Sequence, residues 1–313
     1  MKFRTRAVAA LAAGAAVATV TGAVAAPADA ARSGLAGRVD RATAQATARG
    51  AHVQIAFLDR VTRQYVDNGA VAHTGAETAS VVKVFIADDL LYRQSRKQLT
   101  LSRDENARLG LMLRSSDDAA ATYFWDRYGR SSLVDHVVAR YRLADTRPPS
   151  DGEWWDTRTS AADLVGYYDK LMGGQGGVFG SARQTILTNL RASTSTGTDG
   201  YNQRFGVPHA LPRVPVKGVK QGWMIAHSGD WVHNSTAIVD PDGRYAIAVL
   251  TTESASAGDE HTRQTIDDVV HTLFPRGYVQ DDTPFAIPAI PGLPTVQGLI
   301  NAGTNVVAHG APN

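Results

Sequence analysis

The sequence predicts an α+β fold, in which one antiparallel sheet is flanked by helices and lies beside an all-helical subdomain. Short β-type runs occur near the start of the chain and again after Pro208, Pro212 and Pro215, whereas the residues between them have mostly helical periodicity. Strands from distant segments with a helical insertion between them are typical of one sheet assembled from both parts of a chain.

The elements before residue 80 are predicted to be a helix and a hairpin. Apolar residues recur at helical spacing from Leu35 to Ala46, which indicates an amphipathic helix that starts near Ser33. Residues 52–58 then alternate as a strand, and after a turn at Asp59-Arg60 the chain returns as a second strand over 64–66.

The middle of the chain is predicted to be almost entirely helical. Residues 81–87 are apolar on every side except at Lys83, a pattern typical of a helix buried inside a domain. Further helices are predicted over 106–113, 119–128, 131–141, 159–172 and 182–190.

The last part of the domain returns to β-type patterns. Strands are predicted over 214–219, 231–239 and 245–251, and turn signals such as Pro241-Asp242-Gly243 separate them. A helix over 261–273 closes this part.

The two ends of the chain are predicted to lie outside the folded domain. Residues 1–30 have the form of a secretory signal peptide, with three basic residues, an Ala/Val-rich run and the small-x-small sequence Ala28-Asp29-Ala30. A membrane anchor is the alternative, but the run is rich in alanine rather than leucine, so it would insert weakly. We therefore expect a secreted domain over 31–275, followed by an extended, proline-rich tail over 276–313.

The composition excludes several kinds of partner and cofactor. Cysteine is absent from the 313 residues, which rules out disulfides, zinc-thiolate sites and a lipid-anchored form that begins at a cysteine. Residues 1–30 carry three positive charges and one negative charge. Their removal lowers the net charge from +2 to 0, so the mature chain is expected to be neutral. We expect no nucleic-acid partner, no membrane anchor after cleavage, no metal and no cofactor, and we expect a monomer.

The first motif that carries chemistry is Ser80-Val81-Val82-Lys83, which has the form S-x-x-K. Side chains three residues apart share one face of a helix, so the lysine amine can reach the serine hydroxyl. Burial disfavours the charged form of a lysine, which would make Lys83 a base for Ser80. A capping serine and a surface-reaching lysine are the alternative explanation of these two residues.

Two further motifs follow at a distance. Ser115-Ser116-Asp117-Asp118 precedes a helical run, where it can either cap the helix or supply Ser116 as a second hydroxyl that relays a proton. Lys220-Gln221-Gly222 lies on a predicted strand, where the lysine can hold a carboxylate and the glycine can let a ligand approach the strand. The alternative for Lys220 is an edge-strand lysine that discourages aggregation.

In this order, the three motifs S-x-x-K, S-D-x and K-x-G resemble those of the class A β-lactamases and the penicillin-binding D,D-peptidases. The resemblance covers nearly all of the mature chain, including a helix opening at Asp156-Thr157-Arg158-Thr159. It implies a β-lactamase/transpeptidase-like fold. By this resemblance the catalytic residues are Ser80 as the acylated nucleophile, Lys83 as the base and Ser116 as the proton relay, and the substrate-binding residues are Asp118, Lys220, Gly222 and Trp223.

The resemblance also implies an oxyanion hole formed by the backbone N–H groups of Ser80 and Trp223. The sequence departs from the family pattern at three places. Asp118 stands where the family has asparagine, and Gln221 stands where it has a hydroxyl residue. The loop over 143–155 lacks the family's glutamate motif for the deacylating water, and Glu153 is the best candidate for that role.

The sequence lacks the other common catalytic motifs, including G-x-S-x-G, H-E-x-x-H and G-x-G-x-x-G. His227-Ser228-Gly229 is interpreted as a turn, and Trp154-Trp155 as a hydrophobic plug or an aromatic pair at a cleft mouth. We expect an exported serine hydrolase that is acylated by β-lactams or related amides and peptides and deacylates slowly. The alternatives are a cell-wall D,D-peptidase and a non-catalytic protein that binds cell-wall peptides or penicillin.

Overall fold

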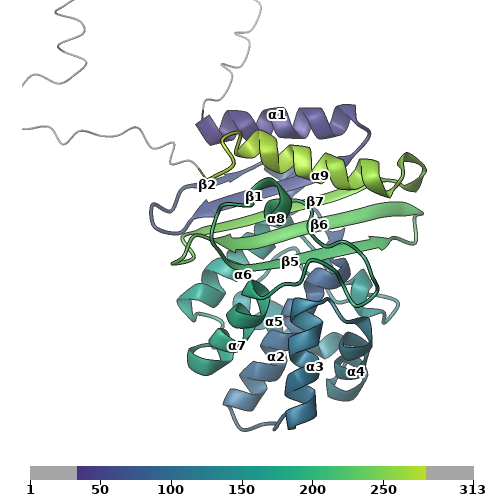
Figure 1. Cartoon of the computed structure of the whole chain (residues 1–313). Helices are drawn as coiled ribbons and strands as arrows, with labels where there is room; N and C mark the ends of the chain where they lie inside the picture. Colours follow the sequence, from purple (N-terminus) through teal and green to yellow (C-terminus); the bar gives the residue numbers. More distant parts are fainter. Residues whose placement is uncertain (1–33, 280–313) are drawn as a thin grey trace, which may run out of the picture. The chain divides into compact units, whose positions relative to one another are not determined.

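A five-stranded antiparallel sheet with the strand order β2-β1-β7-β6-β5 organises the computed structural model, which describes residues 34–279 (Figure 1). Segments from both ends of this range form it, because β1 pairs with β7 along its whole length. The strands are β1 (His52–Asp59), β2 (Tyr65–Asp67), β5 (Val216–Ile225), β6 (Asp230–Val239) and β7 (Tyr245–Ser254).

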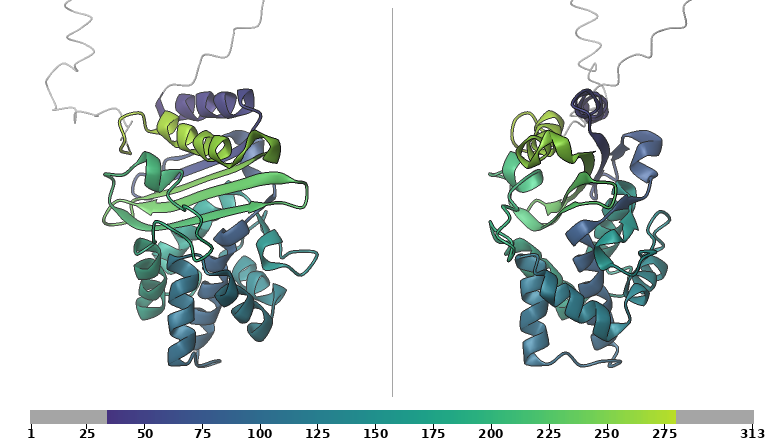
Figure 2. Two further views of the ribbon diagram at one scale, coloured as in Figure 1. Left: turned by 45° about the vertical axis from the view of Figure 1, so that its right-hand side comes forward. Right: turned by 90° about the vertical axis from the view of Figure 1, so that its right-hand side faces the viewer.

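Helices lie on both faces of this sheet (Figure 2). Two of them, α1 (Gly34–Ala48) and α9 (Asp259–Leu273), pack side by side on one face, where the guanidinium of Arg38 donates to the carbonyl of Leu273 at 2.6 Å. The short helix α8 (Val207–Ala210) lies beside α9. The other helices form the opposite layer: α2 (Lys83–Ser95), α3 (Arg103–Arg114), α4 (Asp118–Tyr128), α5 (Ser131–Tyr141), α6 (Ala161–Gly173) and α7 (Gly180–Arg191).

The alternation of side chains along each strand divides the hydrophobic core into two parts. On β7, Ala246, Ala248 and Leu250 belong to the core shared with the helical layer, whereas Ile247 and Val249 belong to the core under α1 and α9. Because helices cover both faces, the central strands are apolar in succession and not only at alternate positions. The sheet therefore holds its strands rigidly between two packed layers.

The fold confirms the predicted α+β class and the predicted helices and strands, although α2 ends at Ser95 and β5 at Ile225, well beyond the predicted runs over 81–87 and 214–219. One predicted helix start is also wrong. The helix expected to open at 156–159 begins at Ala161, because the Ser160 hydroxyl accepts from the backbone N–H of Asp163 and so caps it there. Arg158–Thr159 instead forms β4, which pairs with β3 (Ala76–Glu77) in a small second sheet.

The predicted signal peptide over 1–30 and nearly all of the predicted tail over 276–313 lie outside the described residues. Among the residues that are described, no helix has the length and apolar character needed to cross a membrane.

Candidate active site

The predicted nucleophile lies in a tight turn that leads directly into a buried helix. Ser80 belongs to the 3₁₀ turn Ala79–Val82, and Lys83 is the first residue of α2. Ala79 has the left-handed φ of +44°, which a residue with a Cβ rarely adopts. Such strain occurs preferentially at functional sites. The turn places the Lys83 Nζ atom 2.7 Å from the Ser80 Oγ atom.

Lys83 is completely buried, and its amine has three hydrogen-bond partners, all of them oxygen atoms. Besides Ser80 Oγ, its amine contacts the carbonyl of Ser116 at 2.7 Å and Oδ1 of Asp118 at 2.5 Å. Burial lowers the pKa of Lys83 from its ordinary value, although the Asp118 carboxylate acts in the opposite direction. The amine also lies 4.6 Å from the centroid of the Trp154 ring.

Ser116 connects the two lysines of the site. Its carbonyl accepts from Lys83, and its hydroxyl accepts from Nζ of Lys220 at 2.6 Å. Ser116 also has a left-handed φ of +56°, in the loop between α3 and α4. Lys220 is buried on β5 and donates in addition to the carbonyl of Gln221 at 2.8 Å. Burial and the nearby charge of Lys83 hold the pKa of Lys220 well below its usual range. The structure therefore brings all three motifs together.

Gly222 is required by the packing of the nucleophile turn. A Cβ at this position would lie 2.6 Å from the carbonyl oxygen of Thr78 and 3.2 Å from the backbone nitrogen of Ser80. The sequence predicted that a glycine here makes room for a ligand. The structure gives a different reason for the glycine, because the backbone of residues 78–80 occupies the space next to it.

Asn234 is a positioning residue that the sequence reasoning missed. It lies opposite Gly222 on β6, and its amide donates to the carbonyls of Glu77 at 2.9 Å and Thr78 at 3.0 Å. Asparagine is uncommon inside strands, so its occurrence in the middle of a buried strand was the available signal. Its two bonds fix the segment before Ser80 to the sheet.

Replacing Gly222 by alanine is expected to lower the free energy of unfolding by about 1–3 kcal/mol, because the added Cβ would overpack the turn over residues 78–80. A urea titration measures this change. The control is Gly166→Ala in α6, where a Cβ meets no atom within 4 Å and alanine should not lower the free energy of unfolding. A G222A protein as stable as the wild type would contradict the close packing of Gly222 against this turn.

Gln221 and Glu153 do not lie where the family resemblance suggested. The Gln221 side chain faces the opposite side of β5, where its amide donates to the carbonyl of Phe205 at 2.5 Å and to the Ser235 hydroxyl at 3.0 Å. The loop over 143–155 places Trp154, and not Glu153, against Lys83. Within residues 34–279, the Glu153 carboxylate makes no hydrogen bond or ion pair with either Ser80 or Lys83.

A cavity of about 480 Å³ opens in front of the nucleophile. Ser80 and Asp118 lie in its wall together with Asp199, which belongs to the loop between α7 and α8. The other lining residues are mainly aromatic or apolar: Ala79, Trp154, Trp155, Tyr201, Trp223, Met224, Ile225 and Trp231. Trp223 stacks on Tyr201 with a centroid distance of 4.9 Å and donates from its indole to Asp199 at 3.0 Å. The two lysines are too deeply buried to belong to this lining.

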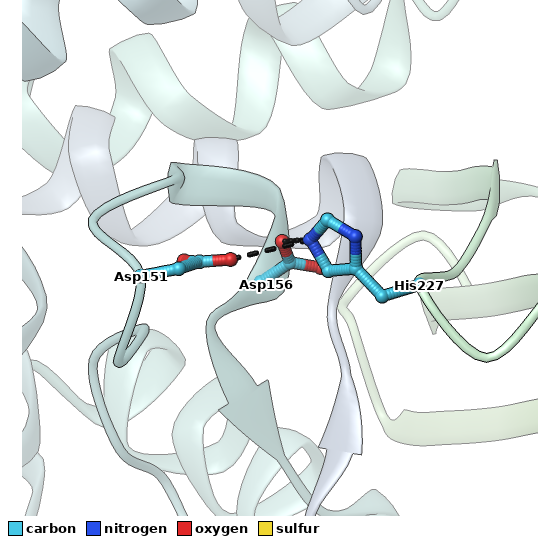
Figure 3. Close-up of side chains that lie close together, drawn as sticks. All are labelled: Asp151, Asp156 and His227. Carbon is cyan, nitrogen blue, oxygen red and sulfur yellow. Dashed lines mark hydrogen bonds and ion pairs between the residues drawn. The ribbon is translucent and has the colours of Figure 1, made fainter.

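His227 connects the β5–β6 turn to the loop that carries Trp154 (Figure 3). As predicted, residues 227–229 form a turn, but the His227 Nε2 atom lies 3.0 Å from Asp156 and 3.3 Å from Asp151. Burial, followed by the proximity of Asp151, raises the pKa of Asp156 to about 6. The Asp156 carboxylate in turn raises the pKa of His227. The contact therefore joins two segments that contribute to the cavity wall.

The ion pair between Asp156 and His227 should be strongest in a pH window that begins at about pH 6, above which Asp156 is ionised. The window ends at the raised pKa of His227, above which the imidazole is neutral. Because His227 binds its proton more tightly in the folded state, its stabilising contribution is present below pH 6.5 and is lost as the pH rises through the folded value. An NMR titration should give a His227 pKa above 6.5 that falls in Asp156→Asn. A value at or below 6.5 in the wild-type protein would contradict the ion pair.

Comparisons with known proteins identify sequence relatives and solved structures with the same fold. No family model matches the chain. Proteins that carry the name lipoprotein LppW, from Mycobacterium tuberculosis and Mycobacterium bovis, are 46% identical over 243 residues, which cover 77% of this chain and 76% of theirs.

Solved structures of class A β-lactamases have the same fold. A β-lactamase from Chitinophaga pinensis has a TM-score of 0.64 at 13% identity, and it covers 77% of this chain and 99% of its own. A class A β-lactamase from Mycobacterium abscessus has a TM-score of 0.61 at 17% identity, covering 76% of this chain and 98% of its own. The β-lactamase-like fold that the three motifs predicted is therefore confirmed.

Proposed function

The chain belongs to the family of the mycobacterial LppW proteins, and on this premise we propose that it is an exported serine hydrolase whose Ser80 is acylated by amides, esters or β-lactams. The observation that carries the proposal is the 2.7 Å distance between Ser80 Oγ and the fully buried amine of Lys83.

The contacts of Lys83 suit a base for the first step. When its amine is neutral, it has two N–H bonds for the carbonyl of Ser116 and for Asp118, and its lone pair then faces the Ser80 hydroxyl. Ser80 Oγ attacks the acyl carbon, its proton passes to Lys83, and the bond to the leaving group breaks. We assign the developing oxyanion to the backbone N–H groups of Ser80 and Trp223, next to the start of α2.

Ser116 and Lys220 suit the return of the proton. The Ser116 hydroxyl accepts from Lys220 at 2.6 Å, and its own proton is therefore free to be donated to a leaving group. Lys83 contacts the same residue through its carbonyl, so the two lysines and Ser116 form one connected set of polar groups.

The second half of the cycle is proposed to be slow. Hydrolysis of the acyl-serine needs a base for the attacking water, and within the described residues the loop over 143–155 places no carboxylate against Ser80 or Lys83. Two of its three acids are engaged elsewhere: Asp145 accepts from Ser160, and Asp151 contacts His227. The indole of Trp154 lies against Lys83 instead. A positioned base contributes about 10²- to 10⁴-fold, so an acyl-enzyme without one should persist.

A non-catalytic binding protein is the second candidate, and the position of Asp118 favours it. A carboxylate 2.5 Å from Nζ of Lys83 stabilises the ammonium form, which cannot accept the proton of Ser80. An extracytoplasmic location is proposed for either function, from the predicted signal peptide and from the relatives whose name is lipoprotein.

The test is a stopped-flow assay with a p-nitrophenyl ester and with a chromogenic cephalosporin. We expect a release of about one equivalent of product, followed by a much slower steady rate, because acylation outpaces deacylation. Ser80→Ala should abolish the burst, whereas Ser95→Ala, at the exposed far end of α2, should not change it. Absence of a burst with both reagents, together with tight binding of a cell-wall peptide, would favour the binding protein.

A further inference from the structure

The positive charges of the active site are internal and do not face a ligand. Lys83 is 0% exposed, and the hydrogen-bond partners of its amine are Ser80, Ser116 and Asp118. Lys220 is 1% exposed, and its amine contacts Ser116 and the carbonyl of Gln221. Among the described residues that line the cavity there is neither an arginine nor a lysine. A carboxylate on the substrate would therefore meet no accessible cation in this wall.

The accessible charges of the cavity are negative. The Asp118 side chain is 67% exposed, and its contact with Lys83 uses one of its two oxygens. Asp199 is also exposed, and it accepts from the backbone N–H of Tyr201 and from the indole of Trp223, both of which are neutral donors. Neither neutral donor cancels the charge of Asp199, so the mouth of the cavity attracts cations and repels anions.

Aromatic rings form much of the remaining wall. Trp223 stacks on Tyr201, and Trp231 lies close to Tyr201 with a centroid distance of 6.4 Å. Trp154 and Trp155 line the cavity from the loop over 143–155, with their rings edge to face at 5.0 Å. The faces of tryptophan and tyrosine rings attract cations. Protein cations already lie near three of these rings: Lys83 is 4.6 Å from the centroid of Trp154, Lys220 is 5.9 Å from that of Trp223, and Arg263 is 5.9 Å from that of Tyr201. Within the described part of the chain, Trp155 and Trp231 have no such neighbour and can meet a ligand cation.

We propose that the cavity selects acyl substrates that carry an ammonium group near the scissile bond, and that it disfavours substrates with a carboxylate there. Asp199 and Trp231 bind the ammonium, while Ser80 attacks the acyl carbon. The inference rests on the proposed function for its chemical step, but ammonium binding does not require that step.

The first test compares three p-nitrophenyl esters whose acyl chains have similar length. The acyl groups are 4-(trimethylammonio)butanoate, its neutral isostere 5,5-dimethylhexanoate, and glutarate. In each case Ser80 Oγ forms an ester with the acyl group, p-nitrophenolate leaves, and the serine proton passes to Lys83. The cationic ester should acylate Ser80 with a kcat/KM about 5- to 30-fold above that of the neutral ester, and glutarate should be the slowest.

A variant separates the charge of Asp199 from its hydrogen bonds. Asn in place of Asp199 keeps an acceptor oxygen for Trp223 and Tyr201 but removes the negative charge. The ratio of kcat/KM for the cationic over the neutral ester should fall about two- to fivefold in this variant. Asp242→Asn makes the same change of net charge in the exposed β6–β7 turn, away from the Trp231 end of β6, and should preserve the preference.

The second test measures binding without chemistry. In the Ser80→Ala protein, tryptophan fluorescence should respond to choline at lower concentration than to its neutral isostere 3,3-dimethylbutan-1-ol, and least to 3,3-dimethylbutanoate. Equal or reversed binding of these probes would overturn the inference, whatever the esters do. Selective choline binding by a protein whose Ser80 no ester acylates would instead overturn the proposed hydrolase and leave the cation site standing.

Discussion

Replacing Lys83 by methionine is expected to slow the acylation of Ser80 by about 10²- to 10⁴-fold, the usual contribution of a positioned base. Methionine has a similar length and no charge to bury, so the variant should fold. The reason for the loss is that no other amine lies within hydrogen-bonding distance of Ser80 Oγ among the described residues. The measurement is the burst rate with a neutral p-nitrophenyl ester.

Two controls accompany this variant. Lys217→Met changes a lysine on the same strand as Lys220 whose amine contacts the carbonyl of Pro241, and it should leave the burst unchanged. In the wild-type protein the burst rate should rise with pH as Lys83 loses its proton, and it should level off below pH 10.5, because burial lowers the pKa of this lysine. An undiminished rate in K83M would show that another group is the base.

Replacing Asp88 by alanine is expected to lower the free energy of unfolding by about 3–5 kcal/mol, which is the usual effect of breaking a buried ion pair. Asp88 is completely buried in α2, where it accepts from Arg140 at 2.6 Å, from the Tyr141 hydroxyl at 2.6 Å and from the Tyr167 hydroxyl at 3.1 Å. Its removal leaves a largely buried guanidinium and two buried hydroxyls without this acceptor.

Urea unfolding at neutral pH measures this effect. Asp126→Ala is the matched control, because Asp126 in α4 pairs with Arg130 in the connection to α5 while both side chains are more than half exposed. Exposed pairs of this kind contribute about 0.2–1 kcal/mol. If D88A and D126A lose similar stability, the polar cluster around Asp88 does not hold the helical layer together as the structure suggests.

The secondary structure could be predicted because apolar residues recur at regular helical or strand spacing along the sequence. The apolar run around Lys83 and the three strands after residue 214 are long enough for their periodicity to be unambiguous. The order of the three motifs then predicted which segments meet, since S-x-x-K fixes a serine and a lysine on one face and a β-strand carries Lys220 to the same place.

The wall of the cavity could not be predicted in the same way. Trp154 lies in a single 3₁₀ turn and Asp199 in an irregular loop, and their side chains are held by tertiary contacts such as the bonds from Trp154 to Thr122 and from Trp223 to Asp199. The same holds for Glu153, which makes no bond to Ser80 or Lys83 among the described residues, whereas its neighbour Trp154 is buried against Lys83. Contacts between distant irregular segments have no periodic signal in a sequence.

Ser80 is proposed to form an acyl-enzyme that persists much longer than the time needed to form it. The most direct measurement is intact-protein mass spectrometry after addition of the neutral p-nitrophenyl 5,5-dimethylhexanoate, sampled over time and followed by peptide mapping. We expect a mass increase of one acyl group, located on the peptide that contains Ser80, absent in S80A and strongly slowed in K83M, and still present long after the free ester is removed. An adduct on another residue, an adduct lost as fast as it forms, or no adduct on a folded protein would contradict this proposal.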